Sequence, residues 1–214
     1  MKWPTRNKNK QTIVEEIFNA ISHGVMIPVS IISFIIFCYT YKKFHISFLF
    51  FSLTMFMLYL MSCLYHSLSF SKAKNHFQRF DHICIYLLIW GSFTPFLLLP
   101  EGPNLFFFIF QSIFVFIGVM LKIFRMRKDK LLHLIIFLLL GWSGIFVIFS
   151  LKKHIHEEPS ILIFLFLGGI FYSLGIIFYK NLYKKFYHFI WHLFVMLGNL
   201  FHVFAVYNFI KCLK

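Results

Sequence analysis

The sequence predicts an all-α protein, a bundle of seven membrane-spanning helices. Of its 214 residues 60% are hydrophobic and only 13% are charged, about half the charged share of an average soluble domain. Short polar breaks divide the chain into seven apolar segments, each long enough or nearly so to cross the hydrocarbon core as a helix. No stretch has the length and polarity of a soluble domain, so we expect one polytopic membrane domain over residues 1–214.

The positions of the polar breaks set the bounds of the predicted spans. These spans cover residues 18–41, 46–68, 82–100, 105–122, 131–151, 161–179 and 188–210. The first twelve residues are basic and polar, but no cleavage-site pattern follows the first apolar segment, so we expect a retained span and not a signal peptide. Gly168, Gly169 and Gly175 in the sixth span are typical of close helix packing in membranes.

Lysine and arginine are distributed unequally between the two ends of these helices. The N-terminal tail and the loops after the second, fourth and sixth spans carry fifteen of the 21 cations. Because cytoplasmic loops are enriched in Lys and Arg, this bias predicts a multi-pass protein of the cell (inner or plasma) membrane with a cytoplasmic N-terminus and an outside C-terminus. The net charge of +14 is then explained by contacts with anionic lipid headgroups, and nucleic acid is not an expected partner.

Two histidines in the last span have the spacing of a metal-chelating pair. His188 and His192 are four residues apart, so on a helix they share a face with Cβ atoms about 5–6 Å apart. Residues 189–210 contain no Asp, Glu, Lys or Arg, and ionisable groups in such a segment are costly and mark function by default. The alternative is that both histidines only pair with neighbouring helices as structural polar contacts, and the spacing alone does not decide between these interpretations.

The predicted topology brings further polar residues to the same depth near the cytoplasmic face. The second span ends there with Ser62 and His66, which share a helix face, and the third span begins there with Asp81. The seventh span adds His188 and His192. The first span adds a set of polar residues from its first turns, namely Glu16, Asn19, Ser22 and His23. Polar groups from four helices are therefore expected to converge on one layer.

Three imidazoles of this layer make a donor set that suits zinc. His66, His188 and His192 are the candidate metal ligands, and in a catalytic site of this kind the fourth position holds water. Asp81 and Ser62 are the candidate catalytic residues, because either side chain could accept a proton from that water or orient a histidine. The alternative for Asp81 is a helix N-cap at the start of the third span, a role that can coexist with the catalytic one.

Four blocks of sequence resemble a known family in their order and combination. Residues 16–23 read EIFNAISH, residues 62–66 read SCLYH, residues 81–95 read DHICIYLLIWGSFTP, and residues 188–202 read HFIWHLFVMLGNLFH. Together they span essentially the whole chain and resemble the hemolysin III proteins, the bacterial branch of the progestin and adipoQ receptor (PAQR) family. Trp90 departs from the family pattern, which usually has alanine before the glycine that corresponds to Gly91.

The resemblance carries its own expectations. It implies seven helices with a cytoplasmic N-terminus and a zinc ion held by His66, His188 and His192. It also implies that Asp81 holds the water at the zinc, with Ser62 beside it. The wider superfamily that shares these residues includes alkaline ceramidases, which suggests hydrolysis of a lipid amide.

Three functions compete at this point. The first is a zinc-dependent intramembrane hydrolase of a lipid amide or ester, with membrane lipids as partners and substrates. The second is a non-enzymatic sensor or regulator of membrane state in which zinc only clamps helices together. No cysteine lies at a ligand spacing, which leaves a coordination position for water and favours the enzyme. The third, a pore-forming cytolysin, ranks last because seven apolar helices have no soluble form.

Three polar residues near the proposed ligands receive weaker assignments. His202 lies about 15 Å along the helix from His192, too far to share a metal, and is expected to form an interhelical hydrogen bond. Glu16 and His23 are expected to form a second polar cluster at the inner face, although Glu16 is equally well explained as a first-turn acid.

Overall fold

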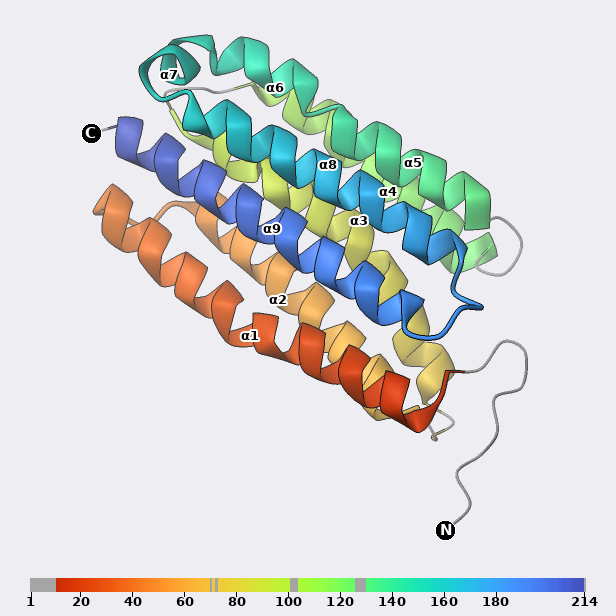
Figure 1. Ribbon diagram of the computed structural model, residues 1–214. Helices are drawn as coiled ribbons and strands as arrows, with labels where there is room; N and C mark the ends of the chain where they lie inside the picture. The colour runs from red at the N-terminus through yellow and green to blue at the C-terminus, as the bar shows by residue number, and fades with distance from the viewer. Residues whose placement is uncertain (1–10, 70, 72, 101–103, 126–129, 214) are drawn as a thin grey trace.

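The computed structural model describes residues 11–69, 71, 73–100, 104–125 and 130–213. Over these residues the chain forms nine α-helices and no strand (Figure 1). Seven spans are long and apolar enough to cross a membrane, so the predicted all-α seven-span architecture is confirmed. The helices are α1 (Ile13–Tyr41), α2 (Ile46–Ser67), α3 (Lys74–Leu98), α4 (Leu105–Arg125), α5 (Lys130–Trp142), α6 (Ile145–Ser150), α7 (Lys152–Glu157), α8 (Ser160–Lys180) and α9 (Tyr187–Cys212).

The first, third and fifth helices depart most from the predicted bounds. The first span was expected from residue 18, but α1 begins at Ile13, after the Thr12 cap. The third span was expected from residue 82, but α3 begins at Lys74 because the polar segment before the span continues the same helix. The fifth span is broken after Trp142, and α6 resumes it at Ile145. A Cβ atom on Gly144 in this break would lie 2.4 Å from the ring of Phe93 on α3, so a side chain would displace that ring.

Several of the Lys and Arg residues that were counted to predict the membrane topology lie outside the described residues. They are Lys2, Arg6, Lys8, Lys10, Lys72, Arg127, Lys128 and Lys214.

A hydrogen bond joins the start of α1 to the start of α9. Thr12 caps α1, accepting from the Glu15 backbone N–H, while the Glu15 carboxylate accepts from the Thr12 N–H at 2.8 Å. The other oxygen of Glu15 accepts from the Phe186 backbone N–H at 2.8 Å, just before α9. This contact sets the first turns of both helices at one end of the bundle, where α2 ends and α3 begins (Figure 1).

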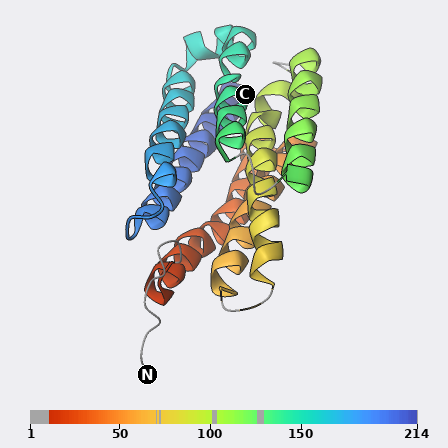
Figure 2. The same ribbon diagram turned by 90° about the vertical axis from the view of Figure 1, so that its right-hand side faces the viewer.

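Glycines bring α8 and α9 close together along their length (Figure 2). A Cβ atom on Gly168 would lie 3.0 Å from the Gly198 carbonyl oxygen and 2.1 Å from the His202 ring. A Cβ atom on Gly175 would lie 3.1 Å from the Cβ atom of Phe194. A larger side chain at Gly168 would therefore displace His202, and one at Gly175 would require Phe194 to shift by a few tenths of an ångström, as expected for small residues between membrane helices.

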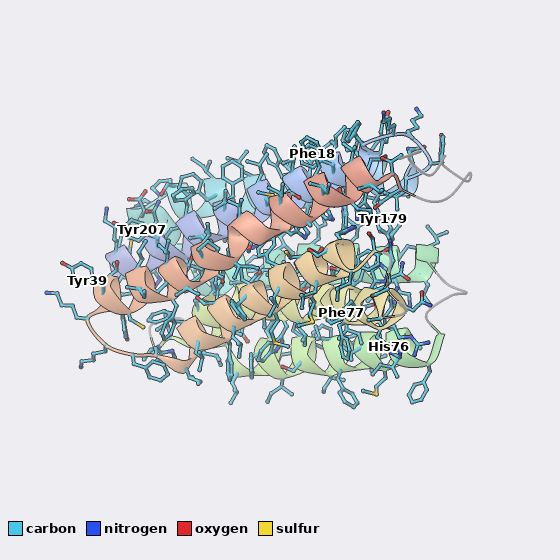
Figure 3. All side chains as sticks on the ribbon, turned by 90° about the horizontal axis from the view of Figure 1, so that it is seen from below. Phe18, Tyr39, His76, Phe77, Tyr179 and Tyr207 are labelled. Carbon is cyan, nitrogen blue, oxygen red and sulfur yellow. The ribbon has the colours of Figure 1, made fainter. Side chains whose placement is uncertain are left out.

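The two ends of the bundle can be told apart by labelled side chains. Tyr39 and Tyr207 lie at one end, and His76, Phe77 and Tyr179 lie at the other (Figure 3). The second end is the one at which α1 and α9 begin and α2 ends, so His66 in the last turn of α2 and His188 and His192 in the first turns of α9 lie toward it.

Candidate metal centre

Three buried imidazoles from two helices meet near the starts of α1 and α9. His66 comes from the last turn of α2, and His188 and His192 come from the first two turns of α9. Each offers one ring nitrogen, and these three atoms lie within 4.8 Å of one another. The Nε2 atoms of His66 and His188 are 3.1 Å apart. The i, i+4 spacing therefore places both α9 rings beside the histidine of α2.

A carboxylate behind His66 fixes the tautomer of that ring. His66 Nδ1 lies 2.7 Å from Glu16 Oε2, and a carboxylate can only accept, so Nδ1 carries the proton. The lone pair of Nε2 then points toward the other two histidines. The second oxygen of Glu16 pairs with the ammonium of Lys74 on α3. Glu16 thereby joins α1, α2 and α3 around one metal-ligand candidate.

The Ser22 hydroxyl group fixes the tautomer of the His192 ring. Ser22 Oγ donates its only proton to the Asn19 carbonyl at 2.9 Å, so it must accept from His192 Nδ1, 3.1 Å away. His192 Nε2 is therefore the unprotonated nitrogen, and it has no hydrogen-bond partner within the part of the chain that the structure describes. On its other side the His192 ring stacks on His23, with ring centroids 3.6 Å apart and planes 11° from parallel.

The donor set fits a zinc ion. Two imidazole nitrogens bound tetrahedrally at about 2.0–2.1 Å from zinc lie about 3.3–3.4 Å apart, close to the 3.1 Å between the Nε2 atoms of His66 and His188. A hydrogen bond between these two rings would also suit that distance, but it would leave His192 Nε2 buried and unpaired. One cation shared by the three rings would account for all three nitrogens. Partners on the far nitrogens, as Glu16 and Ser22 provide, are usual for histidines that bind metal.

Ser62 lies one turn before His66 on α2, and Asp81 on α3 neighbours Ser62, but neither residue is part of the cluster. Asp81 is buried, and its electrostatic neighbours include Ser62 on α2 and Lys122 on α4. Ser62 is also buried, and its hydroxyl neighbours the Asp81 carboxylate without a hydrogen bond of normal geometry to any described residue. The oxygens of Asp81 are not among the ligand atoms that lie within 4.8 Å of one another. The N-cap interpretation of Asp81 is wrong, because α3 begins two turns earlier with Ala73 as its cap.

The orienting partners of the histidines are the functional contacts that the sequence did not assign. Glu16 was expected in a separate polar cluster or as a first-turn acid, yet it contacts His66 directly. Ser22 was placed in the polar layer without a partner. One signal was available, since Glu16, Asn19 and His23 recur at spacings of three and four and therefore share a face of α1.

An apolar cavity of about 150 Å³ adjoins the cluster on the side of His23. Its walls come mainly from apolar side chains of α3, α5, α6 and α8, and His202 of α9 contributes a second imidazole. Trp142 and Phe166 line the cavity and are also 40% and 41% exposed on the outside of the bundle. Trp142 Nε1 donates to Ser173 Oγ at 3.0 Å across α5 and α8. The cavity therefore reaches the apolar outer surface between these two helices.

Trp90, the departure from the family pattern, lies away from the histidines. Its indole N–H donates to Ser112 Oγ on α4 at 2.8 Å, and its ring packs against Phe50 and Phe108. The larger side chain therefore joins α3 to α2 and α4 and does not contact a candidate ligand.

This chain is similar to known proteins over most of its length. The chain matches the family described as Haemolysin-III related over residues 11–203. It is 40% identical to the Hemolysin-3 homolog of Bacillus subtilis (strain 168) over 197 residues, 88% of this chain and 91% of the relative. It is 36% identical to Hemolysin-3 of Bacillus cereus, with 92% of each chain covered. The human Monocyte to macrophage differentiation factor is 29% identical over 72% of this chain and 66% of its own length. The chain belongs to the Haemolysin-III related family.

Proposed function

We propose that this membrane protein is a zinc-dependent intramembrane hydrolase of a lipid amide or ester. The observation that carries the proposal is the convergence of His66, His188 and His192 with two of the rings held in the ligand tautomer by Glu16 and Ser22. Zinc held by these three rings would polarise a substrate carbonyl and lower the pKa of a water molecule to about 7.

Each remaining polar residue then has a defined task. Asp81 accepts the proton of the attacking water, because it is a buried carboxylate that neighbours Ser62, one turn from His66, and is not one of the clustered ligands. Ser62, one turn before His66 on the same face, holds Asp81 or the water by a hydrogen bond. Glu16 and Ser22 keep His66 and His192 oriented while the reaction proceeds.

A lipid substrate is favoured by the cavity next to the cluster. Its walls are apolar, it reaches the outer surface between α5 and α8, and His23 connects it to the stacked ring of His192. A hydrocarbon chain could enter from the bilayer and lie in the cavity while its carbonyl group reaches the histidines. An amide or ester is the expected scissile bond, since zinc and a general base together suit attack on a carbonyl carbon.

The name of the two Bacillus relatives raises the alternative of a cytolysin, which the outer surface disfavours. Large apolar side chains cover it, with Phe106 81% exposed and Phe149 76% exposed. A secreted toxin would need a soluble form in which such a surface is covered.

Measurement of the metal and lipid content of the purified wild-type protein tests the proposal. We expect about one zinc ion per chain and release of a fatty acid from a lipid amide or ester. Protein that carries no metal after purification without chelators, and takes up none from added zinc, would contradict it.

Replacing Glu16 with Gln tests how the ligands are oriented. The amide keeps the size of the side chain but loses the charge that pairs with Lys74 and accepts from His66. We expect zinc affinity to fall about 10–100-fold, the usual cost of removing such a partner. The matched control is Glu15→Gln, which alters the neighbouring carboxylate that accepts from the Thr12 and Phe186 backbone N–H groups. Equal zinc affinities in the two variants would contradict the orienting role of Glu16.

We also propose that the N-terminus is cytoplasmic and the C-terminus outside in the cell membrane. The distribution of Lys and Arg supports this orientation. In a variant without the four native cysteines, Lys43→Cys should react with a membrane-impermeant maleimide on intact cells. Lys184→Cys should react only after permeabilisation. The reverse labelling pattern would show that the bundle has the opposite orientation and that the histidines lie near the outer face.

A further inference from the structure

A second group of buried polar side chains lies deeper in the bundle than the histidine cluster. It consists of Tyr59 on α2, Tyr172 on α8, and Asn199 and His202 on α9, which we call the mid-membrane polar group. Tyr59 and Asn199 are fully buried, and His202 is 6% exposed. Both hydroxyls, both amide atoms of Asn199 and Nδ1 of His202 are buried without a hydrogen-bond partner among the described residues. The interhelical hydrogen bond expected for His202 is therefore not formed at Nδ1.

These four side chains are neighbours. The ring of Tyr172 meets the ring of His202 edge-on, with centroids 5.5 Å apart. The Tyr172 hydroxyl also has Tyr59 and the Asn199 amide as electrostatic neighbours, although no pair satisfies strict hydrogen-bond geometry. Gly168 allows His202 to take this place, because a Cβ atom there would lie 2.1 Å from the imidazole.

The mid-membrane polar group shares a wall with the apolar cavity. Tyr172 and His202 line the cavity together with His23, which stacks on His192. Asn199 and His202 follow His192 by about 10 and 15 Å along α9 at 1.5 Å per residue. Tyr59 lies at the near side of the group, because its ring meets the His23 ring edge-on with centroids 5.0 Å apart. Of the two members that line the cavity, His202 lies about 15 Å along α9 from His192, so the cavity runs from beside the metal centre to the far side of the group.

Unpaired polar groups at this depth are costly, because no bulk water is present to satisfy them. Their chemistry restricts what could pair with them. Phenol, amide and imidazole groups offer both donors and acceptors, and no lysine or arginine belongs to the group. A ligand that both donates and accepts, such as a hydroxyl group, matches this set, whereas a carboxylate would lack a counter-ion.

We propose that the mid-membrane polar group binds a hydroxyl group carried on the hydrocarbon chain of the lipid. This inference rests on the proposed function, which places the carbonyl end of that lipid at the three histidines. An extended chain covers about 10–15 Å in about 8–12 carbons. The site therefore selects mid-chain hydroxylated lipids over lipids with an unsubstituted chain.

Binding of octadecanoic acid and its hydroxy isomers to the purified, zinc-loaded protein tests this selection. We expect isomers with the hydroxyl group on carbon 10 or 12 to bind about five- to tenfold more tightly than octadecanoic acid, the effect of one buried hydrogen bond. The 2-hydroxy isomer should show no such gain, because its hydroxyl group remains near the histidines. Equal affinities across the series would overturn the inference and indicate that water alone satisfies these side chains.

Tyr172→Phe removes one hydroxyl group of the site and keeps the ring against His202. It should abolish most of the preference for the mid-chain isomers, measured as the ratio of their affinity to that of octadecanoic acid for the same variant, while zinc content stays unchanged. Tyr39→Phe is the control, since Tyr39 is 83% exposed and lies at the end of the bundle opposite Tyr179 (Figure 3).

The outcomes separate this inference from the proposed function. If octadecanoic acid binds but no isomer is preferred, only the hydroxyl site is wrong. If no chain binds to zinc-loaded protein, both proposals are wrong. If Tyr172→Phe does not fold, the isomer series on the wild-type protein still decides the matter.

Discussion

Alanine at His66, His188 or His192 is expected to remove most of the zinc from the protein. Each substitution deletes one of three nitrogens that lie within 4.8 Å of one another. Loss of a direct ligand should lower zinc affinity by more than the roughly 10–100-fold cost of losing an orienting partner. Metal analysis of purified variants at matched zinc concentration measures the effect.

The same substitutions should lower the thermal unfolding temperature, because the bound ion would join α2 to α9 and its binding energy would contribute to folding. Chelation of the wild-type protein should reproduce this loss of stability, and chelation of the His66→Ala variant should add little to it.

His202→Ala provides the matched control, since it removes a buried imidazole from the same helix. His202 is not one of the three clustered ligands, so zinc content should remain near that of the wild-type protein even if stability falls. Loss of zinc from His202→Ala with retention by His188→Ala would show that the ligands are wrongly assigned.

The seven spans could be predicted because hydropathy alone identifies a helix that must cross a bilayer. The errors in the predicted helix bounds lie at positions that hydropathy does not determine. The helix α3 begins at Lys74, since a polar segment can continue a helix beyond the hydrocarbon core. The break after Trp142 falls where Gly144 approaches the Phe93 ring of α3, a tertiary contact that no local pattern records.

The candidate site also has features that could be predicted from the sequence and features that depend on tertiary packing. The pair His188 and His192 could be found from helical spacing, and the topology placed His66 at the same depth. The hydrogen bond between Glu16 and His66 joins residues fifty positions apart on different helices, so a single sequence offers no direct sign of it. The cavity and the mid-membrane polar group likewise depend on how α8 packs on α9.

Asp81→Asn is expected to keep the metal and to lose nearly all hydrolysis. The amide is almost isosteric with the carboxylate but cannot accept the proton of the attacking water. A general base typically contributes about 10²–10⁴-fold to the rate, so a loss of this size is expected in a lipid-hydrolysis assay. Zinc content, measured on the same preparation, should be unchanged, because Asp81 is not one of the clustered ligands.

Two other results would each change the interpretation of the site. If the wild-type protein retains zinc but hydrolyses no lipid amide or ester, and Asp81→Asn alters stability alone, the metal is a clamp between α2 and α9 in a non-enzymatic regulator of membrane state. If Asp81→Asn empties the site, Asp81 is a fourth protein ligand. A coordination shell closed by four protein ligands is typical of structural zinc and leaves no position for the attacking water, so that result would count against the hydrolase.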